Sequence, residues 1–254
     1  MKARQGIQVA ALSDVGLVRE NNEDAYLYWE AEEDREFDRK GRLAVIADGM
    51  GGYEGGQEAS RIAVETVRDA YQDSRLKDPS AALHEAFRAA HDQIVSHALQ
   101  HPQFQGMGTT CTAAAIVGSD LYLAHLGDSR LYLIHKGEIL RLTRDHSYVG
   151  RLVENGIVRS EDAERHPQRH ILTAAMGVGR EAMPDISSQP HSLQEGDTVV
   201  LCTDGLWGVV NESEIATAVS VAVPQLAAEA LVEKALSRGG PDNITLQILR
   251  IGHL

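Results

Sequence analysis

The chain has 254 residues, of which 43% are apolar and 24% charged, an ordinary globular composition that excludes long disordered stretches. The length fits a single domain, residues 1–254, with a large core. Lys and Arg number 24 against 37 Asp and Glu, so the formal net charge is −13. No basic run offsets this charge, and we therefore expect no nucleic-acid partner.

The cysteines and the absence of long apolar stretches predict a cytoplasmic protein. No apolar segment like that of a secretory signal follows Met1, and no stretch approaches the ~20 apolar residues that a membrane helix needs. We therefore expect no membrane partner. Cys111 and Cys202 lie in separate strand-like stretches, which favours two buried thiols in a reducing compartment.

Apolar patterning predicts an alternation of strand and helix blocks along the chain. In chain order we expect strands at 7–13 and 25–29, an exposed hairpin or loop at 30–40, a strand at 43–47, helices at 58–71 and 80–99, strands at 109–117, 121–126, 130–135 and 138–142, a helix at 148–154, a strand at 198–203, helices at 212–219 and 224–237, and a strand at 244–251. Ser80 is expected to cap the second helix. The order predicts a sheet-on-sheet core flanked by helices.

Acidic residues recur where the predicted strands begin or end. The acids in such positions are Glu23 and Asp24, Asp48, Asp128, Asp204 and Asp242. Asp-Gly alone is ordinary turn chemistry, so no single position is informative. Carboxylates brought together would repel one another, and bound divalent cations with a preference for oxygen ligands would remove that repulsion. The repeated use of Asp thus favours a Mg²⁺ or Mn²⁺ site.

Six motifs carrying these acids resemble the type 2C serine/threonine protein phosphatases in their compact bacterial form. They occur in the family's order between about Val9 and Ile251, and all six together are a specific signature. The motifs are Arg19-Glu20-Asn21-Asn22-Glu23-Asp24, Ala47-Asp48-Gly49-Met50-Gly51-Gly52, Gly108-Thr109-Thr110, Gly127-Asp128-Ser129-Arg130, Cys202-Thr203-Asp204-Gly205-Leu206-Trp207 and Gly240-Pro241-Asp242-Asn243.

The resemblance implies an α+β fold, a four-layer α-β-β-α sandwich of two antiparallel sheets with the metals at one edge. It implies two or three Mn²⁺ or Mg²⁺ ions, held by Asp48, the Gly49 carbonyl, Asp128, Asp204 and Asp242. Glu23 and Asp24 would act through water or from a second layer, and Arg19 would bind the substrate phosphate. A water activated by the ions would attack phosphorus directly, without a phosphoenzyme.

The resemblance also leaves points open. Met50 stands where animal members carry the histidine proposed as general acid, so a metal-bound water or His146 could be the proton donor, and a surface or capping role for His146 is favoured. His166 and His170 have the spacing of a helical zinc pair, but Pro167 argues against a helix through both. Residues 146–180 would form a flap beside the site, where substrate contact and mere surface variability remain equally open.

We therefore expect a protein serine/threonine phosphatase whose partners are phosphorylated proteins, the products of a Ser/Thr kinase. Two alternatives stay open at this point. One is a non-catalytic regulator that binds phosphoproteins on the same fold, and the other is a hydrolase of small phosphate esters.

Overall fold

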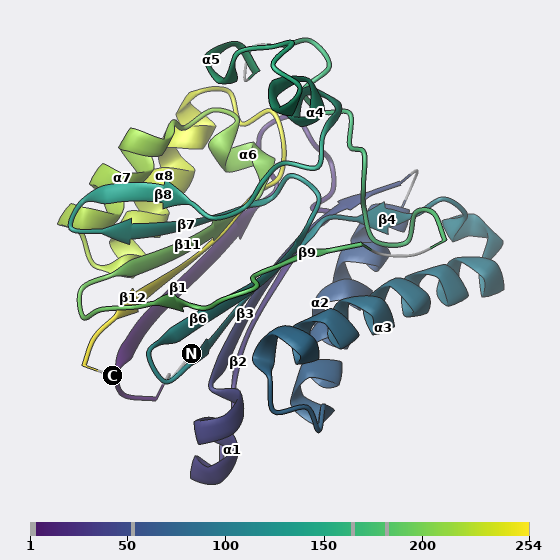
Figure 1. Ribbon diagram of the computed structural model, residues 1–254. Helices are drawn as coiled ribbons and strands as arrows, with labels where there is room; N and C mark the ends of the chain where they lie inside the picture. The colour runs from purple at the N-terminus through teal and green to yellow at the C-terminus, as the bar shows by residue number, and fades with distance from the viewer. Residues whose placement is uncertain (1–3, 52–53, 164–165, 181–182, 254) are drawn as a thin grey trace.

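Two antiparallel sheets make up the centre of the molecule (Figure 1). The computed structural model describes residues 4–51, 54–163, 166–180 and 183–253, so Gly52 of the second motif lies outside the described residues. The first sheet has the order β1 (Ile7–Asp14), β12 (Ile244–Ile251), β11 (Thr198–Cys202), β7 (Arg130–His135) and β8 (Glu138–Arg141). The second has the order β10 (His191–Ser192), β6 (Asp120–Leu126), β5 (Cys111–Val117), β3 (Arg42–Met50) and β2 (Asp24–Glu30), with β4 (Gly108–Thr109) on β3 and β9 (Asp185–Ile186) on β6.

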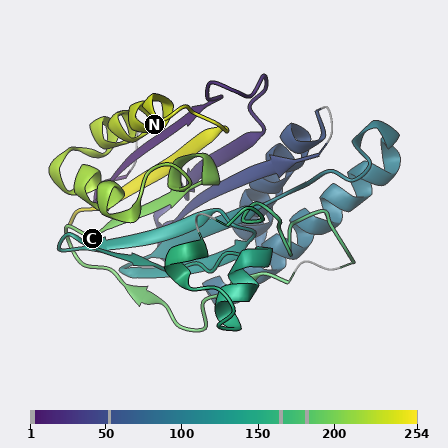
Figure 2. The same ribbon diagram turned by 90° about the horizontal axis from the view of Figure 1, so that it is seen from above.

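Helices cover the outer face of each sheet, on opposite sides of the molecule (Figure 2). On the second sheet lie α2 (Gly55–Asp73) and α3 (Pro79–Gln100), and on the first lie α7 (Glu212–Val221) and α8 (Pro224–Ser237). The remaining helices are α1 (Asp34–Lys40), the short 3-10 helix Pro102–Phe104, α4 (Tyr148–Glu154), α5 (Ser160–Ala163) and α6 (Asp204–Trp207). The predicted four-layer sandwich is confirmed.

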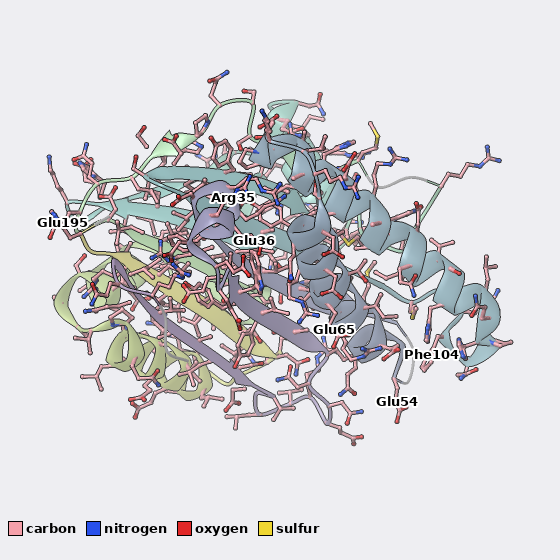
Figure 3. The ribbon with its side chains drawn as sticks, turned by 90° about the horizontal axis from the view of Figure 1, so that it is seen from below. Arg35, Glu36, Glu54, Glu65, Phe104 and Glu195 are labelled. Carbon is pink, nitrogen blue, oxygen red and sulfur yellow. The ribbon has the colours of Figure 1, made fainter. Side chains whose placement is uncertain are left out.

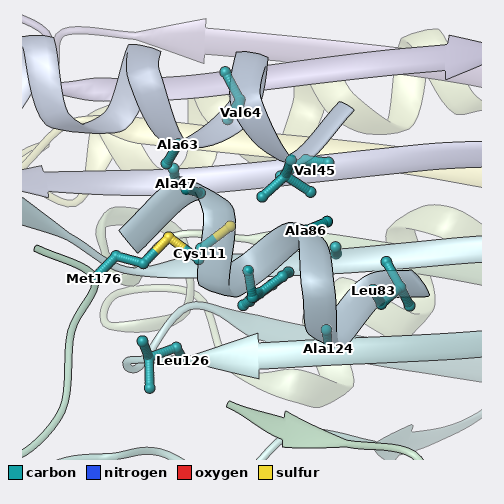
Figure 4. Packing of buried hydrophobic residues seen from close by; sticks show 14 of the residues in the cluster. Val45, Ala47, Ala63, Val64, Leu83, Ala86, Cys111, Ala124, Leu126 and Met176 are labelled. Carbon is teal, nitrogen blue, oxygen red and sulfur yellow. The ribbon is translucent and has the colours of Figure 1, made fainter. Parts of the chain in front are cut away.

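The alternation of side chains along β3 explains why the layers stack. Val45 and Ala47 face α2 and α3 in a cluster that also contains Leu83, Ala86 and Met176 (Figure 4). Ala44 and Ile46 point the other way and pack against Leu201 and Leu249 of the first sheet. Successive residues of a strand face opposite sides of a sheet, and here both sides are covered, so the apolar run around 43–47 is continuous.

Two local predictions were wrong. The charged stretch 30–40, expected as a hairpin or loop, contains α1, and Phe37 of that helix packs between the guanidinium groups of Arg4 and Arg42, 4.6 and 4.7 Å from its ring centre. The N-cap of α3 is Asp78 rather than Ser80, because Pro79 occupies the first helical position and the Asp78 carboxylate accepts the Ser80 N–H.

The acidic residues divide between one sheet edge and the general surface. Glu36 of α1, Glu65 of α2, Glu54 directly before α2 and Glu195 in the loop before β11 lie on or near the surface (Figure 3). They contribute to the net charge without forming a site. Across the described residues, none of the helices combines the length and apolar character that a membrane span requires.

Candidate metal centre

A cavity of about 780 Å³ opens at the edge where β3, β6 and β11 end and β12 begins. Five of the six predicted acids line it together, namely Glu23, Asp48, Asp128, Asp204 and Asp242. Arg19 and Gly49 line it as well, as do residues 169–170, 172–175 and 178–179. The structure thus gathers acids that are as many as 219 positions apart, from Glu23 to Asp242, at one place.

Backbone pairing at the end of β3 fixes Asp48. Its N–H donates to Thr110 Oγ1 at 2.9 Å, and its carbonyl accepts from Thr109 Oγ1 and from the Thr110 N–H, each at 2.8 Å. A Cβ on the next residue, Gly49, would lie 2.1 Å from the Gly56 carbonyl oxygen. Only glycine therefore allows β3 to run so close to the first turn of α2 with Asp48 facing the cavity.

The neighbouring strands fix Asp204 and Asp24. Asp204 is the first residue of α6, where a Cβ on Gly205 would lie 1.9 Å from the Asn243 carbonyl oxygen. Asp24 pairs with Asp48 in the β2–β3 register, and its Oδ2 accepts a 2.9 Å hydrogen bond from Thr203 Oγ1. Asp24 is not among the described residues that line the cavity, and it lies beside Asp48 on the neighbouring strand.

The turn that carries Asp128 is held from two sides. Trp207 Nε1 donates to the Asp128 carbonyl at 3.0 Å, and Ser129 Oγ hydrogen-bonds Thr110 Oγ1 at 2.8 Å. Gly127 has a φ of +115°, and a Cβ there would lie 2.5 Å from Thr110 Cβ. The Thr110 hydroxyl therefore links the Asp48 strand end to the Asp128 turn.

Two nitrogen-bearing side chains, Arg19 and His170, already contact the cavity's carboxylates. Arg19 makes a bidentate ion pair with Asp242, with Nε–Oδ1 at 2.8 Å and Nη2–Oδ2 at 2.9 Å. His170 Nδ1 lies 3.5 Å from Asp204 Oδ2. The Arg19 guanidinium thus contacts a carboxylate that the sequence resemblance assigns to a metal ion.

The acids are in electrostatic conflict. Burial, followed by the nearby charges of Asp24, Asp204, Asp128 and Asp242, raises the pKa of Asp48 well above its usual value. Burial also raises the pKa of Asp24 to about 7, against hydrogen bonds from Thr245 and Thr203 that lower it. The pKa of Asp128 is well above normal, first through burial and then through Asp204 and Asp145. Burial raises the pKa of Glu23 as well.

The donor set nevertheless fits divalent cations. Asp204 Oδ1 and Asp24 Oδ1 are buried without a hydrogen-bond partner, and cations would satisfy such oxygens and remove the repulsion. In the described part of the chain, no three His, Cys, Asp or Glu side chains yet stand close enough to hold one ion. The carboxylate of Asp242 contacts Arg19 and that of Asp204 contacts His170, so neither is gathered with the other acids around a common point.

Comparison with known proteins agrees with this geometry. Residues 18–238 match the family described as protein phosphatase 2C. The chain belongs to the protein phosphatase 2C family. It is 36% identical over 250 residues to the protein phosphatase PhpP of Streptococcus pneumoniae, covering 96% of this chain and 97% of PhpP.

A second relative is longer. The chain is 37% identical over 242 residues to the serine/threonine protein phosphatase PstP of Mycobacterium tuberculosis, covering 95% of this chain but 44% of PstP, so it spans less than half of that protein. A crystal structure of the PstP catalytic domain in complex with two manganese ions superimposes with a TM-score of 0.83 at 34% identity, covering 97% of this chain and 99% of that one.

Other predictions about the site had mixed outcomes. Met50, at the position where animal members carry a histidine, lines the cavity. His146 is not among the described residues that line the cavity, and its ring contacts Gly127 and Asp185. No helix runs through His166 and His170, as Pro167 predicts.

Sequence reasoning missed the contributions of Asn243 and His170. The Asn243 amide accepts the Glu23 N–H and donates to the carbonyls of Val15 and Asn21, so it locks the Arg19 loop onto the start of β12. The one feature of the sequence that could have indicated a role for Asn243 is its position beside Asp242 in a family motif. His170 was considered only as a zinc ligand, and nothing local indicates that it reaches Asp204.

Proposed function

We propose that this chain is a metal-dependent protein serine/threonine phosphatase. The observation that carries the proposal is the convergence of Asp48, Asp128, Asp204 and Asp242 on one cavity with Arg19 at its side. Strong mutual repulsion among these acids is a liability for an unliganded fold, and it is what a site built for divalent cations requires. The named relatives, PhpP and PstP, support the same activity class.

In this proposal Asp48, Asp128, Asp204, Asp242 and the Gly49 carbonyl hold two or three Mn²⁺ or Mg²⁺ ions. When bound, such ions lower the pKa of water to near neutrality and offset the charge of a phosphoryl group. Glu23 lies on the cavity wall, where it can act through water, and Asp24 supports Asp48 from the neighbouring strand. No cysteine takes part, because burial raises the pKa values of both thiols and keeps them protonated.

Arg19 has two roles that follow from its ion pair. In the absence of ions its guanidinium neutralises Asp242. If Asp242 held a cation instead, the planar guanidinium would be free to bind two oxygens of a substrate phosphate. Arg19 is half exposed, with 52% of its side chain accessible, so this change needs no repacking of the core.

The substrates we propose are proteins carrying phosphoserine or phosphothreonine made by a Ser/Thr kinase, in a cytoplasmic signalling system. The two buried free thiols, Cys111 and Cys202, suit a reducing compartment. Residues 146–180 would act as a flap, since the stretches 169–170, 172–175 and 178–179 line the cavity.

The test measures phosphate release from phosphothreonine peptides, p-nitrophenyl phosphate and sugar phosphates, with Mn²⁺, with Mg²⁺ and with EDTA. We expect metal-dependent turnover that is highest on the peptides and is abolished in Asp204→Asn. Turnover that EDTA leaves unchanged would refute the proposal. Metal binding without turnover would instead indicate a binding regulator, and preference for sugar phosphates a small-ester hydrolase.

A further inference from the structure

His146 makes a reciprocal pair of hydrogen bonds with the turn that carries Asp128. The His146 backbone N–H donates to the Gly127 carbonyl at 2.7 Å, and the Gly127 N–H donates back to His146 Nδ1 at 3.3 Å. Both bonds end on the peptide groups directly before Asp128. The orientation of that turn therefore depends on a histidine 18 positions further along the chain.

The second ring nitrogen fixes the tautomer. His146 Nε2 lies 3.2 Å from Asp185 Oδ2 on β9, and the His146 side chain is only 10% exposed. Because Nδ1 accepts from Gly127, the ring proton of the neutral imidazole is on Nε2 and is donated to Asp185. A carboxylate that holds a histidine through one nitrogen orients whatever the other nitrogen contacts.

The same residue connects this turn to the base of residues 146–180. The Thr173 N–H donates to the His146 carbonyl at 2.8 Å, and the Tyr148 N–H donates to the Ile171 carbonyl at 2.7 Å. Residues 173–175 then continue along the cavity wall. His146 thus lies between the Asp128 turn and the segment that faces it across the cavity.

We infer that His146, held by Asp185, is a positioning residue that aims Asp128 into the cavity and couples it to the base of the 146–180 segment. The inference rests on the proposed function only in that Asp128 binds a cation. It assigns His146 a task other than proton donation, since its ring nitrogens are directed at Gly127 and Asp185.

Two variants separate positioning from general stabilisation. His146→Asn places an amide oxygen near the position of Nδ1, so it can still accept the Gly127 N–H, but it is too short to reach Asp185. His146→Leu has similar bulk and loses both contacts. Both variants lose the Asp185 contact, so the metal-free melting temperature should fall in each, whereas only His146→Leu should misplace Asp128.

The experiment counts bound Mn²⁺ from the electron paramagnetic resonance signal of the free ion, and thus does not depend on turnover. For the weakest-bound class of Mn²⁺ we expect His146→Leu to lose about tenfold or more in affinity, as is typical when an outer partner of a ligand is removed, and His146→Asn to stay within about threefold of the wild type. If His146→Leu does not fold, His146→Gln replaces it, because Gln reaches toward Asp185 but offers no acceptor at the Nδ1 position.

Asp128→Asn distinguishes the possible failures. Suppose that Asp128→Asn weakens Mn²⁺ binding. If His146→Leu then binds Mn²⁺ as the wild type does, or if His146→Asn and His146→Leu bind Mn²⁺ equally well, His146 is not a positioning residue and the proposed function stands. If Asp128→Asn itself binds Mn²⁺ like the wild type, Asp128 is not a ligand, and that part of the proposed function fails together with the inference.

Discussion

Acidification should destabilise the protein through one buried histidine. His125 lies on β6 with no exposed surface, its Nδ1 2.8 Å from Thr112 Oγ1 and its Nε2 3.0 Å from the Arg144 carbonyl. Burial lowers the pKa of His125 from 6.5 to about 4. The His125 and His146 rings are 4.9 Å apart, so a protonated His125 would disturb the network beneath the Asp128 turn.

The direction and size of the change in unfolding free energy follow from the pKa of His125 in the unfolded chain, 6.5, and in the folded chain, about 4. Above pH 6.5 the imidazole is neutral in both the folded and the unfolded state, and stability is complete. Between pH 6.5 and pH 4 the unfolded chain binds a proton that the folded chain does not, so the free energy of unfolding falls as the pH falls. A difference of 2.5 pKa units corresponds to a loss of about 3 kcal/mol by pH 4.

The assay is urea unfolding in EDTA at a series of pH values, for the wild type and for His125→Asn, whose amide can still accept the Thr112 hydroxyl. Buried acids such as Asp48 titrate in both proteins, so the difference in unfolding free energy isolates His125. That difference should shrink by about 3 kcal/mol between pH 7 and pH 4. A constant difference would refute the reasoning, and the exposed His84→Asn substitution serves as the matched control.

Three further predictions concern the cavity. Asp48→Asn should abolish turnover and the stabilisation by Mn²⁺, which for the wild type at 100 times Kd is about 2.7 kcal/mol per site and raises the melting temperature; calorimetry that shows an unchanged rise in melting temperature would exclude Asp48 as a ligand. Gly49→Ala should cost about 2–3 kcal/mol in thermal unfolding, since its Cβ would meet the Gly56 carbonyl oxygen at 2.1 Å, while Gly252→Ala, with 3.5 Å to its nearest neighbour, is the tolerated control. Arg19→Lys should raise KM for phosphopeptides by about tenfold with a smaller change in kcat, because Lys lacks the planar fork; an unchanged KM in steady-state kinetics contradicts phosphate binding by Arg19.

The sequence was sufficient to predict the layers and the main acids because both leave regular patterns. The continuous apolar run around Leu43–Ala47 predicts a strand covered on both faces, and the Asp-Gly that follows marks its end at the cavity. The two helices with apolar stripes, α2 and α3, were found for the same reason. Apolar residues that recur at a regular spacing can be recognised in the sequence without knowledge of the tertiary structure.

What could not be predicted depends on single contacts between distant residues. Helix α1 has one apolar anchor, Phe37, and its two cationic partners come from outside the helix, so no periodicity indicates it. The ion pair between Arg19 and Asp242 spans 223 positions. The role of His146 likewise depends on Asp185, a residue on a two-residue strand that was not predicted.

The hydrogen bond from Trp207 Nε1 to the Asp128 carbonyl gives the protein a built-in optical probe. Trp207 also stacks on the Arg130 guanidinium at 3.6 Å, so its indole senses both the turn and the local charge. The other tryptophan, Trp29, pairs with Leu43 at the opposite end of the β2–β3 ladder from Asp48. Replacing Trp29 with Phe would leave Trp207 as the one tryptophan, beside Asp128. Its emission would then report the binding of a cation by Asp128 in real time, without substrate.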